Sequence, residues 1–148
     1  PNAVLRTRLG LSVIHRPVHS IPGIASSFKE TVALEIVRVA TGGTYDDPGQ
    51  RIGQDVAVSL RIIERRPCTE AARFAFRLAR QRGLSVTSSS KHTIQRATDG
   101  FFEAIVREVA QQHGAEISVA DAQPRAVALA SGTGPGTLIT VRFPVRRA

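Results

Sequence analysis

The residue with the clearest potential for chemistry is Lys91, which lies at the end of a predicted strand. Its segment reads SVTSSSKHTIQRATDGFFEAIVREVA, a short β-branched run and three serines followed by a long helical pattern. The chain has 20 lysine and arginine residues, of which only Lys29 and Lys91 are lysines. A lysine can lose its charge when its surroundings change, whereas an arginine keeps it. Lys91 is therefore a candidate for proton transfer, and the alternative is a lysine kept at a strand end by accident.

Length and composition indicate one soluble, globular domain, because 148 residues with 42% hydrophobic content suffice for a real core. The sequence has no apolar run long enough to cross a bilayer and no secretory signal, so we expect no membrane. The lone cysteine, Cys68, excludes an intrachain disulfide and fits a reducing compartment, which predicts a cytoplasmic protein. Cys68 follows Pro67 at the start of a predicted helix, where a small buried role is favoured over a reactive thiol.

The formal net charge of +8 is compatible with nucleic acid, with anionic metabolites or with no specific partner. A nucleic-acid partner is not favoured, because the arginines are spread along the chain and aromatic residues make up only 5%. We therefore expect a small anionic molecule as the partner.

Hydrophobic patterns predict strands and helices that alternate in the second half of the chain, as in α/β or α+β domains. Residues 41–50, rich in glycine and aspartate, are predicted to form a turn. In the last helix the residues expected to share a buried face are Ile94, Ala97, Phe101, Ile105 and Val109. Helices are expected at residues 3–11, 67–83 and 93–114, and strands at 12–18, 31–40, 55–63, 84–89, 116–122 and 137–145.

Three blocks of sequence carry a family resemblance. The segment around Lys91 has the form V-T-x-x-x-K, followed by T-D-G-F at Thr98 to Phe101 and E-V-A at Glu108 to Ala110. Upstream lie VRVATGGTY at Val37 to Tyr45 and LRTRLGLSVIHRPV at Leu5 to Val18. In this order the blocks resemble the isocitrate and isopropylmalate dehydrogenase family, and the resemblance covers roughly residues 3 to 122.

The resemblance implies a role for five residues. In such dehydrogenases the arginines matching Arg6, Arg16 and Arg38 bind the carboxylates of the substrate, which suits the planar and permanently charged guanidinium. The residues matching Tyr45 and Lys91 transfer protons around the hydroxyl group and the enol intermediate. The lysine comes from the partner subunit in this family, so the resemblance implies a homodimer with sites at the subunit interface.

Asp121 looks like the first of the family's metal-binding aspartates, and a helix cap is the alternative for this residue. One aspartate makes a poor Mg²⁺ site unless the substrate supplies ligands. Mg²⁺ or Mn²⁺ is therefore a possible cofactor only if it binds together with the substrate. His92 neighbours Lys91 and is a weaker candidate for the same cleft.

The chain also departs from the family pattern. It has no G-x-G-x-x-G, no cofactor loop of the family and no G-D-I-L-S-D-like stretch with the remaining metal aspartates. Val39 and Thr93 replace the usual glutamate and asparagine of two motifs. We therefore expect residues 1–148 to be a single isopropylmalate-dehydrogenase-like domain without the cofactor domain. Its predicted fold is α/β, with a small mixed sheet flanked by helices.

Three functions follow as hypotheses. The first is a stand-alone, repurposed domain that performs non-redox acid–base chemistry on an acidic or enolic small molecule, by decarboxylation, isomerisation, dehydration or cyclisation. The second is a non-catalytic ligand-binding or regulatory partner of a full-length dehydrogenase. The third is a split or truncated NAD(P)-dependent 2-hydroxy acid oxidative decarboxylase. For the first hypothesis we expect no organic cofactor, because the sequence offers no recognisable site for one.

Overall fold

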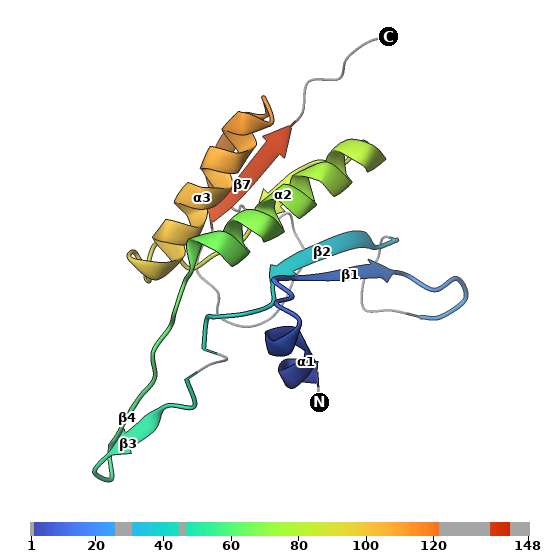
Figure 1. Ribbon diagram of the computed structural model, residues 1–148. Coiled ribbons are helices and arrows are strands. Elements are labelled where there is room, and N and C mark those ends of the chain that lie inside the picture. Colours follow the sequence, from blue (N-terminus) through green and yellow to red (C-terminus); the bar gives the residue numbers. More distant parts are fainter. Residues whose placement is uncertain (1, 26–30, 45–46, 122–136, 143–148) are drawn as a thin grey trace. The chain divides into compact units, whose positions relative to one another are not determined.

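Figure 1 shows the computed structural model, which describes residues 2–25, 31–44, 47–121 and 137–142. The chain divides into two compact units, residues 1–74 and 75–148, and the boundary falls within one long helix. Among the described helices none is long and apolar enough to cross a membrane.

The first unit is built on a two-stranded antiparallel ribbon of β1 (Val13–His19) and β2 (Ala33–Val39). Helix α1 (Asn2–Arg8) precedes the ribbon, and Gly10 follows it with a φ of 60°, a conformation that glycine adopts without a Cβ clash. Pro17 lies inside β1, as expected for an edge strand, because each strand of a two-stranded ribbon has one open edge.

A short hairpin of β3 (Gln50–Ile52) and β4 (Val56–Val58) follows in the same unit. The sequence predicts a turn at 41–50 and one strand over 55–63, so β3 was missed and β4 is shorter than expected. Residues 51–62 are all exposed. Pairing without a buried face stabilises a strand weakly, which explains why the ladder stays short.

Helix α2 (Arg65–Arg82) starts two residues before its predicted start and spans the boundary between the two units. Phe76 is fully buried, whereas Phe74 is half-buried. Burying a phenylalanine side chain contributes about 2–3 kcal/mol, so Phe76 is a main anchor of this helix. The buried residues of α2 that have small or apolar side chains are Cys68, Ala71, Ala72, Phe76 and Ala79.

The second unit contains a three-stranded antiparallel sheet with the order β5-β7-β6. Its strands are β5 (Val86–Ser88), β6 (Glu116–Asp121) and β7 (Thr137–Arg142), and the last strand in the sequence lies in the middle. Helix α3 (Thr98–Gln112) contacts β6, and Figure 1 shows it alongside β7 of the same sheet. Its buried apolar residues are Ile105, Val106, Val109 and Ala110.

The predicted α/β class is confirmed, since helices alternate with small sheets. Within the described residues the expected small mixed sheet is replaced by three antiparallel sheets, because the paired strands are short and two of the pairs are local hairpins. Antiparallel pairs need only a short connection, whereas parallel pairs need a crossover.

Helix α3 begins at Thr98, five residues after its predicted start. The Asp99 carboxylate accepts the backbone N–H of Lys91, and this local bond competes with extension of the helix toward residue 93. Ile94 is therefore 81% exposed instead of part of the buried face. Ala97 is exposed as well, so only the second half of the predicted apolar stripe packs into the core.

The first prediction concerns Cys68, which is 2% exposed as the sequence indicated. Burial, and then the nearby Glu64 carboxylate, raise the pKa of its thiol above the usual 9.0, so the reactive thiolate is scarce. We expect a thiol reagent at pH 8 to label Cys68 at least about tenfold more slowly in the native protein than in urea. A native rate equal to the rate in urea would contradict this packing.

The second prediction concerns Asp47, whose carboxylate accepts backbone N–H groups of Leu60 and Gly49 at the base of the hairpin. These bonds favour the charged form and lower the pKa of Asp47 below its usual 3.8. Stability from a carboxyl with a lowered pKa is present above 3.8 and is lost as the pH falls through the lower native value. In NMR spectra the amide signals of Gly49 and Leu60 should therefore stay constant above pH 4 and move together below 3.8.

The control for this titration is Asp47→Ala, in which neither amide signal should respond in that range. If both signals still titrate in the variant, another group holds the base of the hairpin.

Candidate functional site

The register of the ribbon brings two of the predicted substrate-binding arginines to one face. Arg16 lies opposite Ile36 and Arg38 lies opposite Ile14, so the two arginines are diagonal neighbours. Diagonal residues on one face of an antiparallel pair are about 7–8 Å apart, within reach of long side chains. Both arginines are exposed. Two guanidinium groups on one exposed face can bind one dicarboxylate or two separate carboxylates.

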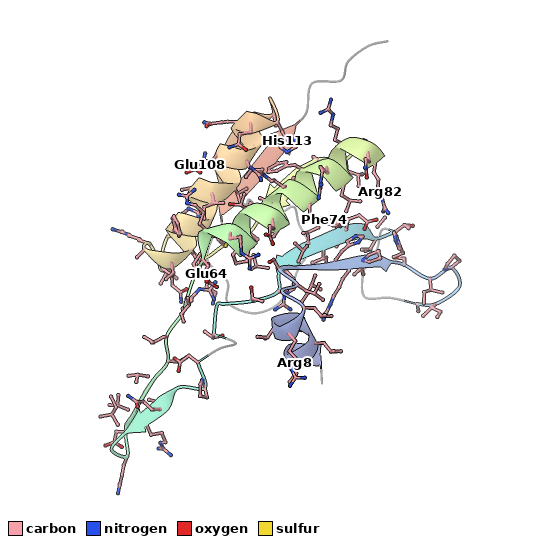
Figure 2. All side chains as sticks on the ribbon, viewed as in Figure 1. Arg8, Glu64, Phe74, Arg82, Glu108 and His113 are labelled. Carbon is pink, nitrogen blue, oxygen red and sulfur yellow. The ribbon has the colours of Figure 1, made fainter. Side chains whose placement is uncertain are left out.

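The opposite face of the ribbon is held by an ion pair. His15 Nε2 lies 2.6 Å from Glu35 Oε2, and the side chains are 27% and 11% exposed. The His15 ring also packs against Phe74 of α2, with 5.5 Å between ring centroids. Figure 2 labels Phe74 on this helix. This face is the more buried one, which leaves the face of Arg16 and Arg38 outward.

Arg6 lies on α1, and its side chain is half-buried. Its backbone carbonyl accepts the N–H of Leu11 at 2.9 Å, which closes the end of the helix. The structure thus places Arg6 in the same unit as the two ribbon arginines, on a separate element.

The glycine loop that follows β2 is tightly constrained. Gly42 and Gly43 have φ values of 70° and 66°, and Gly43 forms a two-way backbone bridge with Ile62. A Cβ atom on Gly42 would meet the Ile62 carbonyl oxygen at 3.0 Å, which explains why glycine is needed there. Tyr45, the acid–base candidate two residues further on, lies outside the described residues.

The backbone of Lys91 is fixed on both sides in the second unit. Its N–H donates to Asp99 Oδ1 at 3.0 Å, and its carbonyl accepts from the N–H groups of Ile94 and Gln95 at 3.0 and 2.8 Å. The Thr98 hydroxyl lies 3.4 Å from Asp99 Oδ2. Lys91 itself is exposed, so a fixed backbone presents an accessible amine.

The next residue, His92, is half-buried and paired. Its Nδ1 lies 2.9 Å from Glu103 Oε2 and 3.2 Å from Ser90 Oγ. Arg107 donates to Glu103 Oε1 from Nε and Nη2, at 3.0 and 2.6 Å. Because Ser90 and Glu103 meet the same imidazole nitrogen, His92 cannot relay a proton between them as in a nucleophilic triad.

Asp121 is the last residue of β6, and its backbone pairs with Thr137 of β7. It therefore ends a strand, and the residues that a cap at this position would precede lie outside the described residues. No group of three His, Cys, Asp or Glu side chains that could hold a metal ion occurs within the described part of the chain.

The sequence interpretation missed the two acidic residues beneath Lys91. Asp99 and Glu103 are 3% and 9% exposed, four residues apart on α3. Acidic residues at this spacing inside an apolar face are the signal that could have revealed them, because residues four apart on a helix are neighbours.

Comparison with known proteins gives a consistent result. The family profile described as isocitrate/isopropylmalate dehydrogenase matches residues 2–124. The chain is 34% identical over 113 residues to the chloroplastic 3-isopropylmalate dehydrogenase of Solanum tuberosum, covering 76% of this chain and 31% of that protein. It is 36% identical over 115 residues to human mitochondrial isocitrate dehydrogenase [NAD] subunit gamma, covering 76% and 28%.

Among solved structures, isocitrate dehydrogenase from Methylococcus capsulatus matches with a TM-score of 0.64 and 28% identity, over 76% of this chain and 34% of that one. The chain therefore spans about a third of the length of the relatives it matches.

The glycine loop yields a prediction with an internal control. Gly42 and Gly53 both have a positive φ, 70° and 67°, which an alanine at either position would have to adopt. Only at Gly42 would the new Cβ atom meet a backbone atom. We expect Gly42→Ala to destabilise the protein by about 1 kcal/mol more than Gly53→Ala, because a short contact adds to the backbone cost. Thermal unfolding of the two variants measures the difference, and equal melting temperatures would contradict the close approach.

Proposed function

Because the chain belongs to the isocitrate and isopropylmalate dehydrogenase family, we propose that it binds a small acidic or enolic molecule and transfers protons on it without hydride transfer. In this proposal residues 1–148 correspond to the family's second domain, and the class of reaction is decarboxylation, isomerisation, dehydration or cyclisation. Its location in the cytoplasm remains a prediction, since the similar proteins named above are chloroplastic and mitochondrial.

The observation that carries the proposal is the shared exposed face of Arg16 and Arg38. Two arginines that lie diagonally on one exposed face can both form charge-assisted hydrogen bonds with the carboxylates of one small molecule. Arg6 would add a third cation from α1. A face built this way favours small molecules with two or more carboxylates.

Lys91 and Tyr45 are the proposed proton-transfer residues. In decarboxylation of a β-keto acid, the C–C bond to the carboxylate breaks and CO₂ leaves. The electron pair of that bond moves toward the neighbouring carbonyl group, which becomes an enolate. Lys91 as an ammonium group would give a proton to the enolate oxygen, and Tyr45 would protonate the carbon as the enol returns to the ketone. As the ketone forms, the enol oxygen returns its proton to the Lys91 amine, and the Tyr45 phenolate regains its proton from solvent, so one solvent proton is consumed for each CO₂ released. No oxidant is consumed.

We propose a homodimer in which Lys91 of one subunit meets the arginines of the other. The family resemblance supports this arrangement, and several similar proteins carry the word subunit in their names. The alternative is that the chain pairs with a larger homologue as a regulatory partner. A relative from Dictyostelium discoideum is named a regulatory subunit of isocitrate dehydrogenase [NAD], which motivates this alternative.

Mg²⁺ or Mn²⁺ would have Asp121 as its one protein ligand and would depend on oxygen atoms of the substrate. Such a cation would stabilise negative charge on an enolate. None of the proton transfers above requires it.

NAD appears in the names of several relatives, and a split or truncated NAD(P)-dependent decarboxylase is the third candidate, because the chain spans only about a third of those relatives.

A thermal-shift panel tests the proposal. The probes are malate, a β-keto acid, an enolic compound, Mg²⁺, Mn²⁺, NAD and NADP. We expect an organic acid to raise the melting temperature of the wild type, and Arg16→Gln or Arg38→Gln to weaken its binding at least about tenfold, because charge-assisted hydrogen bonds are lost. Lys91→Ala should weaken it too, and should abolish turnover of any acid that the wild type converts.

Two controls separate a specific site from general charge. Arg80→Gln removes one exposed cation from α2, and Lys29→Ala removes the other lysine, so both should bind the acid as the wild type does. Equal weakening by Arg80→Gln would mean non-specific attraction to a basic protein. A shift with NAD would favour the dehydrogenase candidate, and no shift with any probe would favour the partner-binding candidate.

A further inference from the structure

Asp99 is a buried carboxylate whose hydrogen bond leaves its own helix. It lies in the first turn of α3, where a negative charge is favourable. Its Oδ2 lies 3.4 Å from the Thr98 hydroxyl, and its Oδ1 accepts the N–H of Lys91, eight residues earlier. Asp99 is only 3% exposed. A carboxylate is rarely buried without partners, so this bond is part of what makes the burial tolerable.

Glu103 is the second buried carboxylate on the same side of α3, one turn later. It pairs with His92 at 2.9 Å, and Arg107 holds its other oxygen. His92 Nδ1 in turn lies 3.2 Å from Ser90 Oγ. The residues on each side of Lys91 are therefore linked to one another and, through His92, to α3.

Both carboxylates thus converge on one three-residue segment, Ser90 to His92, and its central residue is the exposed Lys91. A buried carboxylate loses its hydration and therefore needs hydrogen-bond partners in the protein. The hydrogen bond of Asp99 to the Lys91 N–H and the contact of Glu103 with His92 fix the backbone from which the Lys91 amine extends. Proton transfer requires such fixation, because small displacements of a catalytic group reduce the rate strongly.

We propose that Asp99 and Glu103 are positioning residues for Lys91: Asp99 fixes its backbone N–H, and Glu103 fixes the adjacent His92. The inference rests on the proposed function in so far as Lys91 is the group that meets the ligand. The inference goes beyond that function because it explains why two carboxylates are buried next to Lys91.

Backbone order measured by ¹⁵N NMR relaxation on the full chain tests the proposal without any ligand. We expect an order parameter of about 0.85 at Lys91 in the wild type, and below about 0.6 in Asp99→Ala and in Glu103→Ala. The exchange rate of the Lys91 amide proton should rise about tenfold in Asp99→Ala, because its acceptor is gone.

Two matched variants separate positioning from general stability. Asp99→Asn keeps the Oδ1 acceptor and should restore both readings to near the wild-type values. Val109→Ala removes buried volume from α3, where Val109 is 2% exposed, and should lower the melting temperature while leaving Lys91 ordered. Unchanged order and exchange at Lys91 in Asp99→Ala, or equal loss in Val109→Ala, would overturn the proposal.

Malate binding then tests whether the backbone order at Lys91 affects ligand binding. If malate binds the wild type, Asp99→Ala should bind it more weakly and Asp99→Asn should not. Equal binding by Asp99→Ala, despite a disordered Lys91, would overturn the positioning role. If the wild type binds no acid of the panel, the proposed function fails, while the relaxation data still decide whether the two carboxylates fix the segment.

Discussion

The antiparallel register of β1 and β2 is the constraint on which the candidate anion site depends. Side chains alternate between the faces of a strand, so a slip of one residue would move one strand's arginine to the opposite face. His15 and Glu35 oppose such a slip, because their ion pair and the contact with Phe74 occupy the other face. The contact between His15 and Glu35 therefore determines on which face of the ribbon Arg16 and Arg38 lie.

The two units place their charges differently. In the first, the guanidinium groups of Arg16 and Arg38 lie on an exposed face, where solvent screens them and an anion can reach them. In the second, Asp99 and Glu103 are buried and paired, and they support an exposed lysine from below. In this strongly basic chain the two described acids nearest Lys91 are buried, whereas the two ribbon arginines are exposed.

Much of this arrangement was predictable from the sequence. The features that the sequence did not predict have one cause in common, which is that they leave no periodic pattern. The strands of the ribbon and α2 follow from alternation and apolar spacing, whereas the roles that the family motifs suggest for Arg16, Arg38 and Lys91 stay predictions. The start of α3 was misplaced, because the bond between Asp99 and Lys91 is a side-chain contact that periodicity does not encode. The β3–β4 hairpin was missed for a related reason, since its exposed strands carry no buried face to create a pattern.

The central claim is that Arg16 and Arg38 bind one ligand together, and a double-mutant cycle on malate affinity tests it most directly. Calorimetric titration of the wild type, Arg16→Gln, Arg38→Gln and the double variant gives the coupling free energy. Shared recognition predicts a coupling of at least about 0.5 kcal/mol, because neighbours that contact the same partner are not additive. Strictly additive losses, or no loss in either single variant, would contradict the claim.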